Sequence, residues 1–162
     1  KLDGSESVTV RVGNKGEDTI KNIENITGGS KGDKLGGDGK ANTFDGGLGK
    51  DLLTGASGKD KFVFSTALAK SNVDTVTDFK HGQDKIVLDD AIFAAIGGKL
   101  DKAEFYAKAN AKVAHDADDR VIYDAKSGKL YYDADGAGAA AAMLFATIGN
   151  HAAVTHGDFA IV

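Results

Sequence analysis

Four residues with oxygen-bearing side chains, Asp33, Asn42, Asp51 and Asp60, recur every nine residues along the chain. Carboxylate and amide oxygens at a regular spacing favour coordination of a hard cation, and Ca²⁺ takes about six to eight such oxygens. Other chemistries lack their residues. Cysteine is absent, which excludes disulfides, thiolate ligands and cysteine nucleophiles. No H-E-x-x-H motif occurs. Gly28-Gly29-Ser30-Lys31-Gly32 has the spacing G-x-S-x-G but lies in a glycine-rich segment and not at a predicted strand-to-helix elbow, so we expect neither a catalytic zinc site nor an enzyme.

The four residues share one position in consecutive nine-residue frames that run from Thr19 to Val63. The frames read TIKNIENIT, GGSKGDKLG, GDGKANTFD, GGLGKDLLT and GASGKDKFV. The frame at 46–54 matches the calcium-binding nonapeptide G-G-x-G-x-D-x-U-x at every specified position, where U is a large apolar residue. A flexible Gly/Asp-rich linker could share this composition. It would not place a large apolar residue at every ninth position from Leu35 to Phe62.

Each frame predicts a turn followed by a short strand. Glycines permit the tight turn of the first six residues, and the last three form a strand whose central apolar side chain points inward. Two frames close one coil, and frames two apart then stack about 4.8 Å from each other. Asp51 therefore lies over Asp33, and Asp60 over Asn42. Two carboxylates at this distance repel by about 1 kcal/mol in water, and Ca²⁺ between the coils reverses the sign.

The composition agrees with a turn-rich, cation-binding protein. Of 24 acidic residues 20 are Asp, which favours turns over solvated helices, and Gly is also frequent at 22 of 162 residues. The net charge of −4 gives no basic footprint for nucleic acid. No apolar run is long enough for a membrane span, and no N-terminal signal peptide is visible. Because the chain starts at Lys1, we expect it to be part of a longer protein.

These motifs resemble a known family. The frames at 28–63 resemble the β-roll of repeats-in-toxin (RTX) proteins, which type I secretion systems of Gram-negative bacteria export. The segment Asp74–Phe79, with Gly82, Asp84, Ile86 and Leu88, is similar to the one that follows the β-roll in serralysin-type proteases. The block from Asp116 to Gly136 looks like the C-terminal region of many RTX proteins.

The resemblance implies an all-β fold with a right-handed parallel β-roll at 19–64. One or more lead-in strands would precede the roll at 1–18, and an antiparallel β-strand cap would follow at 65–162. In the second half, 120–123 and 130–132 flank a hairpin turn at 125–128. The alanines of 139–148 favour a helix, but the resemblance favours a strand, which we prefer.

In this family, backbone carbonyls and aspartates of two stacked frames hold each calcium ion. Carried over, the first site comprises Gly28, Ser30, Asp33, Gly47, Gly49 and Asp51. The second comprises Gly37, Gly39, Asn42, Ala56, Gly58 and Asp60, and the uncharged Asn42 should weaken it. Gly46 and Leu48 are further carbonyl donors of the full-match frame, and Asp74 closes a late site. We expect several calcium ions, about two to four.

Three other groups of residues can be interpreted either as metal sites or as ordinary surface structure. Asp116, Asp118 and Asp119 could hold a further ion or form a solvated loop. Asp133-x-Asp135-Gly136 resembles part of an EF-hand loop but lacks the distal Glu, so a turn is the preferred interpretation. The four histidines (His81, His115, His151 and His156) are far apart in sequence and are expected on the surface.

The chain ends with one acidic and four apolar residues: Asp158, Phe159, Ala160, Ile161 and Val162. This end is similar to the uncleaved signal of type I substrates, whereas the pattern alone favours a docked last strand. We expect a secreted module that folds on binding calcium outside the cell. Its partners would be a type I exporter and an N-terminal passenger domain. The alternative is an adhesion or polysaccharide-binding module, which an exposed row of tyrosines (Tyr106, Tyr123, Tyr131 and Tyr132) would favour.

Overall fold

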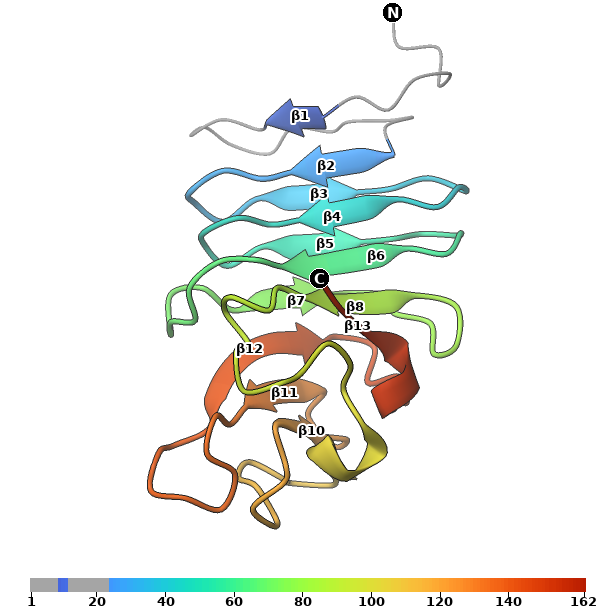
Figure 1. The fold of residues 1–162 in the computed structure, drawn as a ribbon. Coiled ribbons are helices and arrows are strands. Elements are labelled where there is room, and N and C mark those ends of the chain that lie inside the picture. The colour runs from blue at the N-terminus through green and yellow to red at the C-terminus, as the bar shows by residue number, and fades with distance from the viewer. Residues whose placement is uncertain (1–8, 12–23) are drawn as a thin grey trace, which may run out of the picture.

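The computed structural model describes residues 9–11 and 24–162, and within these residues the fold is all-β (Figure 1). The strands are β1 (Thr9–Arg11), β2 (Asn25–Thr27), β3 (Lys34–Gly36), β4 (Thr43–Asp45), β5 (Leu52–Thr54), β6 (Lys61–Phe64), β7 (Asp74–Val76), β8 (Lys85–Leu88), β9 (Phe105–Lys108), β10 (Val121–Asp124), β11 (Lys129–Tyr132), β12 (Met143–Ile148) and β13 (Phe159–Ile161). Two 3₁₀ turns, η1 (Lys102–Glu104) and η2 (His156–Asp158), complete the described secondary structure.

Successive strands of the repeat region alternate between two sheets. One sheet has the order β1-β2-β4-β6-β8-β13, and the other has the order β3-β5-β7-β12-β11-β10-β9. The strands β2 to β8 pair in parallel within their sheets, each with the strand two elements away along the chain, and β1 pairs in parallel with β2. In Figure 1 these strands form a regular stack from β2 down to β8. The turns between them therefore lie along the two long edges of the stack.

The nine-residue spacing of apolar residues produces the core between the two sheets. In each of the strands β2 to β5 the central residue is buried, whereas its neighbours are more exposed. Phe44 and Phe62 are direct register partners, and their rings stack with centroids 5.5 Å apart. Leu35 and Leu53 are the corresponding partners in the other sheet. Each coil thus contributes one large side chain per strand to a continuous apolar column.

The parallel pairing continues beyond the last nine-residue frame. β7 pairs with β5 and β8 pairs with β6, although longer connections replace the six-residue turns. The segment at 74–88, which resembles the one that follows the β-roll in serralysin-type proteases, therefore contributes one strand to each sheet. The predicted lead-in segment at 1–18 contains β1, and its remaining residues lie outside the described part of the chain, as do residues 19–23 of the first frame.

The C-terminal strands extend the second sheet with mixed direction. β12 pairs in parallel with β7, and β11 pairs antiparallel with both β12 and β10. The hairpin predicted around 125–128 is confirmed, and Asp124 holds its turn by accepting hydrogen bonds from the Lys126 amide and the Ser127 hydroxyl. The segment 139–148 ends in strand β12, as the prediction preferred. Phe145 of β12 packs edge-on against Phe64 and Phe93.

The last strand returns to the first sheet. β13 pairs in parallel with β8, so Phe159–Ile161 lies beside Ile86–Leu88. Asp158 immediately before it is buried and accepts hydrogen bonds from the Gly82 and Thr155 amides. Its Oδ2 also lies 2.6 Å from His81 Nδ1. No helix in residues 9–11 and 24–162 is long and apolar enough to cross a membrane.

Candidate metal centre

One edge of the stack carries a column of three carboxylates. Asp33, Asp51 and Asp74 stand at the starts of β3, β5 and β7, which are neighbours in one sheet. The Asp33 amide donates a hydrogen bond to Asp51 Oδ1 at 2.7 Å, and the Asp51 amide donates one to Asp74 Oδ1 at 3.0 Å. Asp51 and Asp74 therefore each reach back with one oxygen to the preceding coil, whereas Asp33 Oδ2 accepts the Gly29 amide of its own turn. All three side chains are buried.

The opposite edge carries a second column, Asn42, Asp60 and Asp84, at the starts of β4, β6 and β8. The Asn42 amide donates to Asp60 Oδ1 at 2.9 Å, and the Asp60 amide donates to Asp84 Oδ1 at 3.1 Å. Glu24 precedes β2 in the same sheet and extends this column by one coil. The six side chains of the two triplets are between 1% and 9% exposed. The columns are thus two buried lines of oxygen atoms.

Glycines in the turns allow the backbone to lie directly on these carboxylates. A Cβ atom on Gly46 would lie 2.3 Å from Asp51 Oδ2, and one on Gly55 would lie 2.5 Å from Asp60 Oδ2. Gly47 has φ +80°, and a Cβ there would lie 2.4 Å from the Gly29 carbonyl oxygen of the stacked turn. The glycine positions of the repeat therefore bring backbone carbonyls and carboxylate oxygens close together at each turn.

Three side-chain oxygens of these columns have no hydrogen-bond partner among the described residues. Oδ2 of Asp51 and Oδ2 of Asp60 are buried and accept no hydrogen bond within the described part of the chain, and the same holds for Oε2 of Glu24. Burial raises the pKa of Asp51 and of Asp60 to about 6, although backbone amides of the stacked coil oppose the shift. Burial also raises the pKa of Asp74 to about 7. A buried carboxylate oxygen without a donor leaves a charge uncompensated.

Lysines do not supply the missing charge. Asp51, Asp60 and Asp74 form no salt bridge with any residue that the structure describes. The described lysines of the repeat region are instead exposed: Lys31, Lys34, Lys40, Lys50, Lys59 and Lys61. Buried negative charge and exposed positive charge are therefore separated. Carboxylates and carbonyls are hard oxygen donors, and this set of ligands fits Ca²⁺ better than a transition metal.

The structure brings the predicted ligands together in the expected pairs of frames. In the first set, Gly28 lies against the Gly46 carbonyl, Gly47 lies against Gly29, and Gly49 lies against Lys31. In the second set, a Cβ on Gly37 would meet the Asn42 side chain. Gly39 by contrast has no atom within 4 Å of its Cβ position. Leu48 is exposed, but its amide donates to the Gly29 carbonyl at 3.0 Å.

Sequence reasoning missed several residues of these edges. Asp84 completes the second column, and Asn72 accepts a hydrogen bond from the Gly49 amide at 2.7 Å. Asp78 accepts hydrogen bonds from the Gly55 and Ala56 amides. A signal for Asp84 was present, because Gly82-x-Asp84-x-Ile86 repeats the spacing of the second half of a frame. A search for a strict nine-residue period misses this half-frame, because the connections that precede it are longer than those of the repeat.

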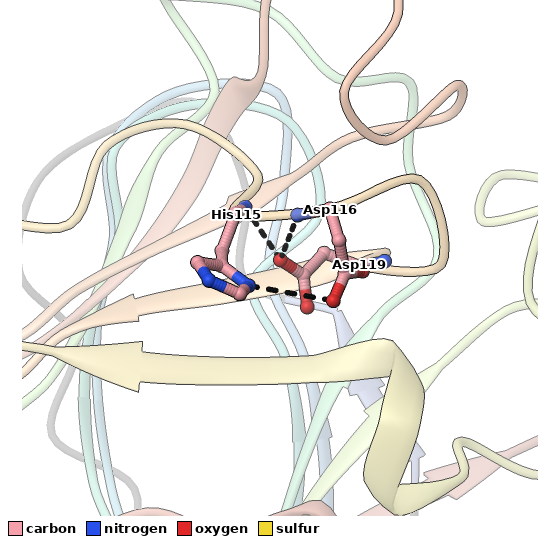
Figure 2. Close-up of side chains that lie close together, drawn as sticks. All are labelled: His115, Asp116 and Asp119. Carbon is pink, nitrogen blue, oxygen red and sulfur yellow. Dashed lines mark hydrogen bonds and ion pairs between the residues drawn. The ribbon is translucent and has the colours of Figure 1, made fainter.

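A separate cluster at 115–119 is explained by loop geometry. Figure 2 shows His115, Asp116 and Asp119, from each of which one ligand atom lies within 4.8 Å of the others. Asp119 Oδ2 accepts hydrogen bonds from the His115 and Asp116 amides, and Asp116 Oδ1 accepts one from the Asp118 amide. These hydrogen bonds fold the loop without an ion. His115 and Asp116 are exposed, which favours the solvated-loop alternative.

The tyrosines, all within the described residues, form no exposed row. Tyr123 and Tyr132 are buried, and the hydroxyl of Tyr123 donates to the Ala152 carbonyl. Tyr106 stacks on the ring of His115. Tyr106 and Tyr131 flank the buried Ile122 in register. This arrangement gives no support to a flat aromatic platform for polysaccharide.

Comparison with protein families gives a match over most of the chain. The family model described as peptidase M10 serralysin C terminal matches residues 11–161. No curated protein matches the chain. The match covers nearly the whole chain and includes both carboxylate columns.

Proposed function

The chain belongs to the serralysin C-terminal family of peptidase M10, and we propose that it is a calcium-binding RTX module without catalytic activity. In this proposal the module is part of a larger secreted protein and folds when it binds calcium outside the cell. The observation that carries the proposal is the pair of buried carboxylate columns with unpartnered oxygens on Asp51 and Asp60. A cation between the turns would compensate these groups when they are ionised.

The ligands follow from the stacking of frames. The first ion would bind Gly28, Ser30, Asp33, Gly47, Gly49 and Asp51, and the second Gly37, Gly39, Asn42, Ala56, Gly58 and Asp60. A third would bind Gly46, Leu48, Asp51 and Asp74, since the Asp51 amide already donates a hydrogen bond to Asp74 Oδ1. Asp84 stands in the same relation to Asp60 and would contribute to a fourth. Calcium supplies the positive charge that holds neighbouring turns together.

Calcium binding and folding would be a single process. Each strand of the repeat has only three or four residues and buries one or two apolar side chains. Glycine-rich turns lose much conformational entropy on ordering, and the stacked carboxylates repel one another. Bound calcium offsets these unfavourable contributions, so that the free energy of binding becomes free energy of folding.

The remaining assignments concern the whole protein. The coils would wind right-handedly as a parallel β-roll, and residues 65–162 would cover its open end, since solenoid ends need covers. Asp158–Val162 would be the signal read by a type I exporter of a Gram-negative bacterium before the chain folds. A passenger domain would precede the module. Low cytosolic calcium would keep the chain unfolded for export, because extracellular sites bind with dissociation constants of about 10⁻⁴–10⁻³ M.

The test is a calcium titration of the metal-free chain followed by far-UV circular dichroism. We expect strand signal to appear cooperatively with calcium and to appear weakly with magnesium, which demands octahedral geometry and retains its waters. Asp118→Ala, which alters an exposed side chain outside the columns, is the matched control and should titrate like the parent. A full strand signal in excess chelator would contradict calcium-driven folding.

A further inference from the structure

A hollow of about 530 Å³ opens beside the first carboxylate column. Its walls come from the turn before β5, from the connection between β6 and β7, from β11, and from the residues before and at the start of β12. Six of its lining residues are apolar: Ala69, Val73, Ala141, Ala142, Met143 and Leu144. The volume lies in the range of sites that hold small molecules, about 300–1,000 Å³. Met143 is 43% exposed, so its side chain remains available at this surface.

The polar groups of the hollow are few and positively charged. Lys50, Lys70 and Tyr131 are the other three lining residues, and the lining contains no carboxylate. Both lysines are exposed, and neither forms an ion pair with a residue that the structure describes. Tyr131 is half-buried and offers one hydroxyl. Two uncompensated ammonium groups therefore stand beside an apolar surface.

This combination selects one class of ligand. A sugar or a peptide backbone carries many hydrogen-bonding groups, and walls of Ala, Val, Met and Leu side chains would leave most of them unpaired. A single-chain amphiphile needs the opposite: apolar walls for its acyl chain and cations for its head group. We propose that the hollow binds a free acyl carboxylate, with its head group at Lys50 and Lys70 and its chain against Val73 and Met143.

The carboxylate column fixes the two lysine-bearing walls relative to each other. Lys50 directly precedes Asp51, and Val73 directly precedes Asp74, whose Oδ1 accepts the Asp51 amide. Asn72 Oδ1 accepts the Gly49 amide in the same connection. The hollow thus exists only when these turns are stacked. Ligand binding would require the folded, calcium-loaded chain, and this dependence is the only respect in which it rests on the proposed function.

The test uses sodium decanoate, below the concentration at which it forms micelles, and calorimetric titration of the calcium-loaded chain. We expect one decanoate per chain. Lys70→Glu should weaken binding by about tenfold or more, because it replaces an attraction with a repulsion. Ala142→Trp should abolish binding by filling the hollow. Lys126→Glu, on the exposed hairpin turn outside the hollow, is the matched control and should bind like the parent.

Circular dichroism of each sample separates the two proposals. A chain that stays unfolded in calcium contradicts the proposed function, whereas a folded chain that does not bind decanoate overturns the assignment of the hollow. Equal binding by the parent, Lys70→Glu and Ala142→Trp also overturns it. A further arm offers vesicles of anionic phosphatidylglycerol. Binding to vesicles without binding to free decanoate assigns the lysines to a membrane surface and overturns the acyl site.

Discussion

The carboxylates of Asp51 and Asp74 are unfavourable to bury without a cation, but the proposed calcium site requires both as ligands. Each accepts one amide hydrogen bond from the previous coil or frame, which favours the charged form, but burial dominates and raises both pKa values. In the metal-free state the fold therefore favours protonated carboxyl groups. With an ion in place the same groups must be deprotonated, because metal and proton compete for the same oxygens.

The metal-free and calcium-loaded chains should depend on pH in opposite directions. Asp51 and Asp60 have folded-state pKa values of about 6, and Asp74 of about 7, all above the ordinary value of 3.8. Between about pH 4 and 7 the unfolded state binds fewer protons than the folded state, so metal-free stability falls as pH rises. Calcium affinity should rise over the same range.

Two series of measurements at several pH values test both dependences: far-UV circular dichroism of the metal-free chain follows its residual strand content, and urea denaturation at saturating calcium follows the stability of the loaded chain. Parallel dependences in the two series would contradict the assignment of these carboxylates as ligands. Below about pH 4 the folded chain should lose stability in both series, because carboxyl groups with a lowered pKa then become protonated. Burial alone would raise the pKa of Asp158, but hydrogen bonds from Gly82, Thr155 and His81 outweigh it and lower that pKa.

Asp51→Ala tests the first column directly. The substitution removes the carboxylate that lies between Asp33 and Asp74 in the column and accepts the Asp33 amide, so it should remove at least one bound calcium and weaken the remainder about tenfold or more. Calorimetric titration with calcium gives the stoichiometry and the affinity. Asp118→Ala should retain both, and a matching result for Asp51→Ala would exclude the stacked arrangement of ligands.

At the scale of a single turn, the frame at 55–63 carries a visible defect. Ala56 stands where the nonapeptide has its second glycine, and the backbone there has φ +66°. This left-handed region costs a non-glycine residue about 1–2 kcal/mol. The stack holds Ala56 in place through its amide, which donates a hydrogen bond to Asp78 Oδ2 at 2.7 Å. The repeat therefore tolerates strain where a later segment supports the turn.

Ala56→Gly should relieve this strain. We expect the calcium-loaded chain to gain about 0.5–1 kcal/mol of stability, less than the full strain because glycine also gains freedom in the unfolded state. Ala41→Gly is the matched control: Ala41 is also exposed, lies in a neighbouring turn, and is not among the positive-φ residues, so glycine should destabilise there. Thermal unfolding in saturating calcium compares the two. A lower midpoint for Ala56→Gly would contradict the strain argument.

The sequence predicts the strands correctly where the nine-residue period is regular, and it fails where the connections become longer. The strands at 34–36, 43–45 and 52–54 could be predicted from the period, because each frame fixes its own turn and inward residue. Asp84 and Asn72 could not, because the steps to these coils grow from 18 residues to 23 or 24. A longer loop can close in many ways, and only the hydrogen bond that it makes reveals its register. The pairing of β12 with β7 depends likewise on tertiary contacts.

At the scale of the whole molecule, the two ends of the described chain are tied into one sheet. β1 begins that sheet and β13 ends it, next to β8. The terminal strand has packing partners, since Phe159 lies 5.6 Å from Phe105, centroid to centroid. The segment proposed as an export signal is thus also the last structural strand. A signal read before folding and a strand that docks afterwards make compatible demands on the same residues.

Changes to residues 158–162 can distinguish their proposed role as an export signal from their role as the last strand. Asp158→Asn keeps the shape of the side chain but weakens its hydrogen bonds with Gly82, Thr155 and His81, and should lower stability by about 1–3 kcal/mol. We expect this variant still to be exported. Deletion of residues 158–162 should abolish export from a strain that carries the exporter, while calcium binding by the columns persists. Normal secretion of the deleted form would refute the signal.

The separation of buried aspartates from exposed lysines also has an electrokinetic consequence. The chain carries a formal charge of −4, so two Ca²⁺ ions bring it to neutrality and a third makes it a cation. The lysines on its exterior do not move, yet the isoelectric point would rise past neutral pH as the columns fill. Proteins near zero charge attract one another most readily. Calcium concentration would therefore set colloidal behaviour, with the direction of migration in an electric field reversing on saturation.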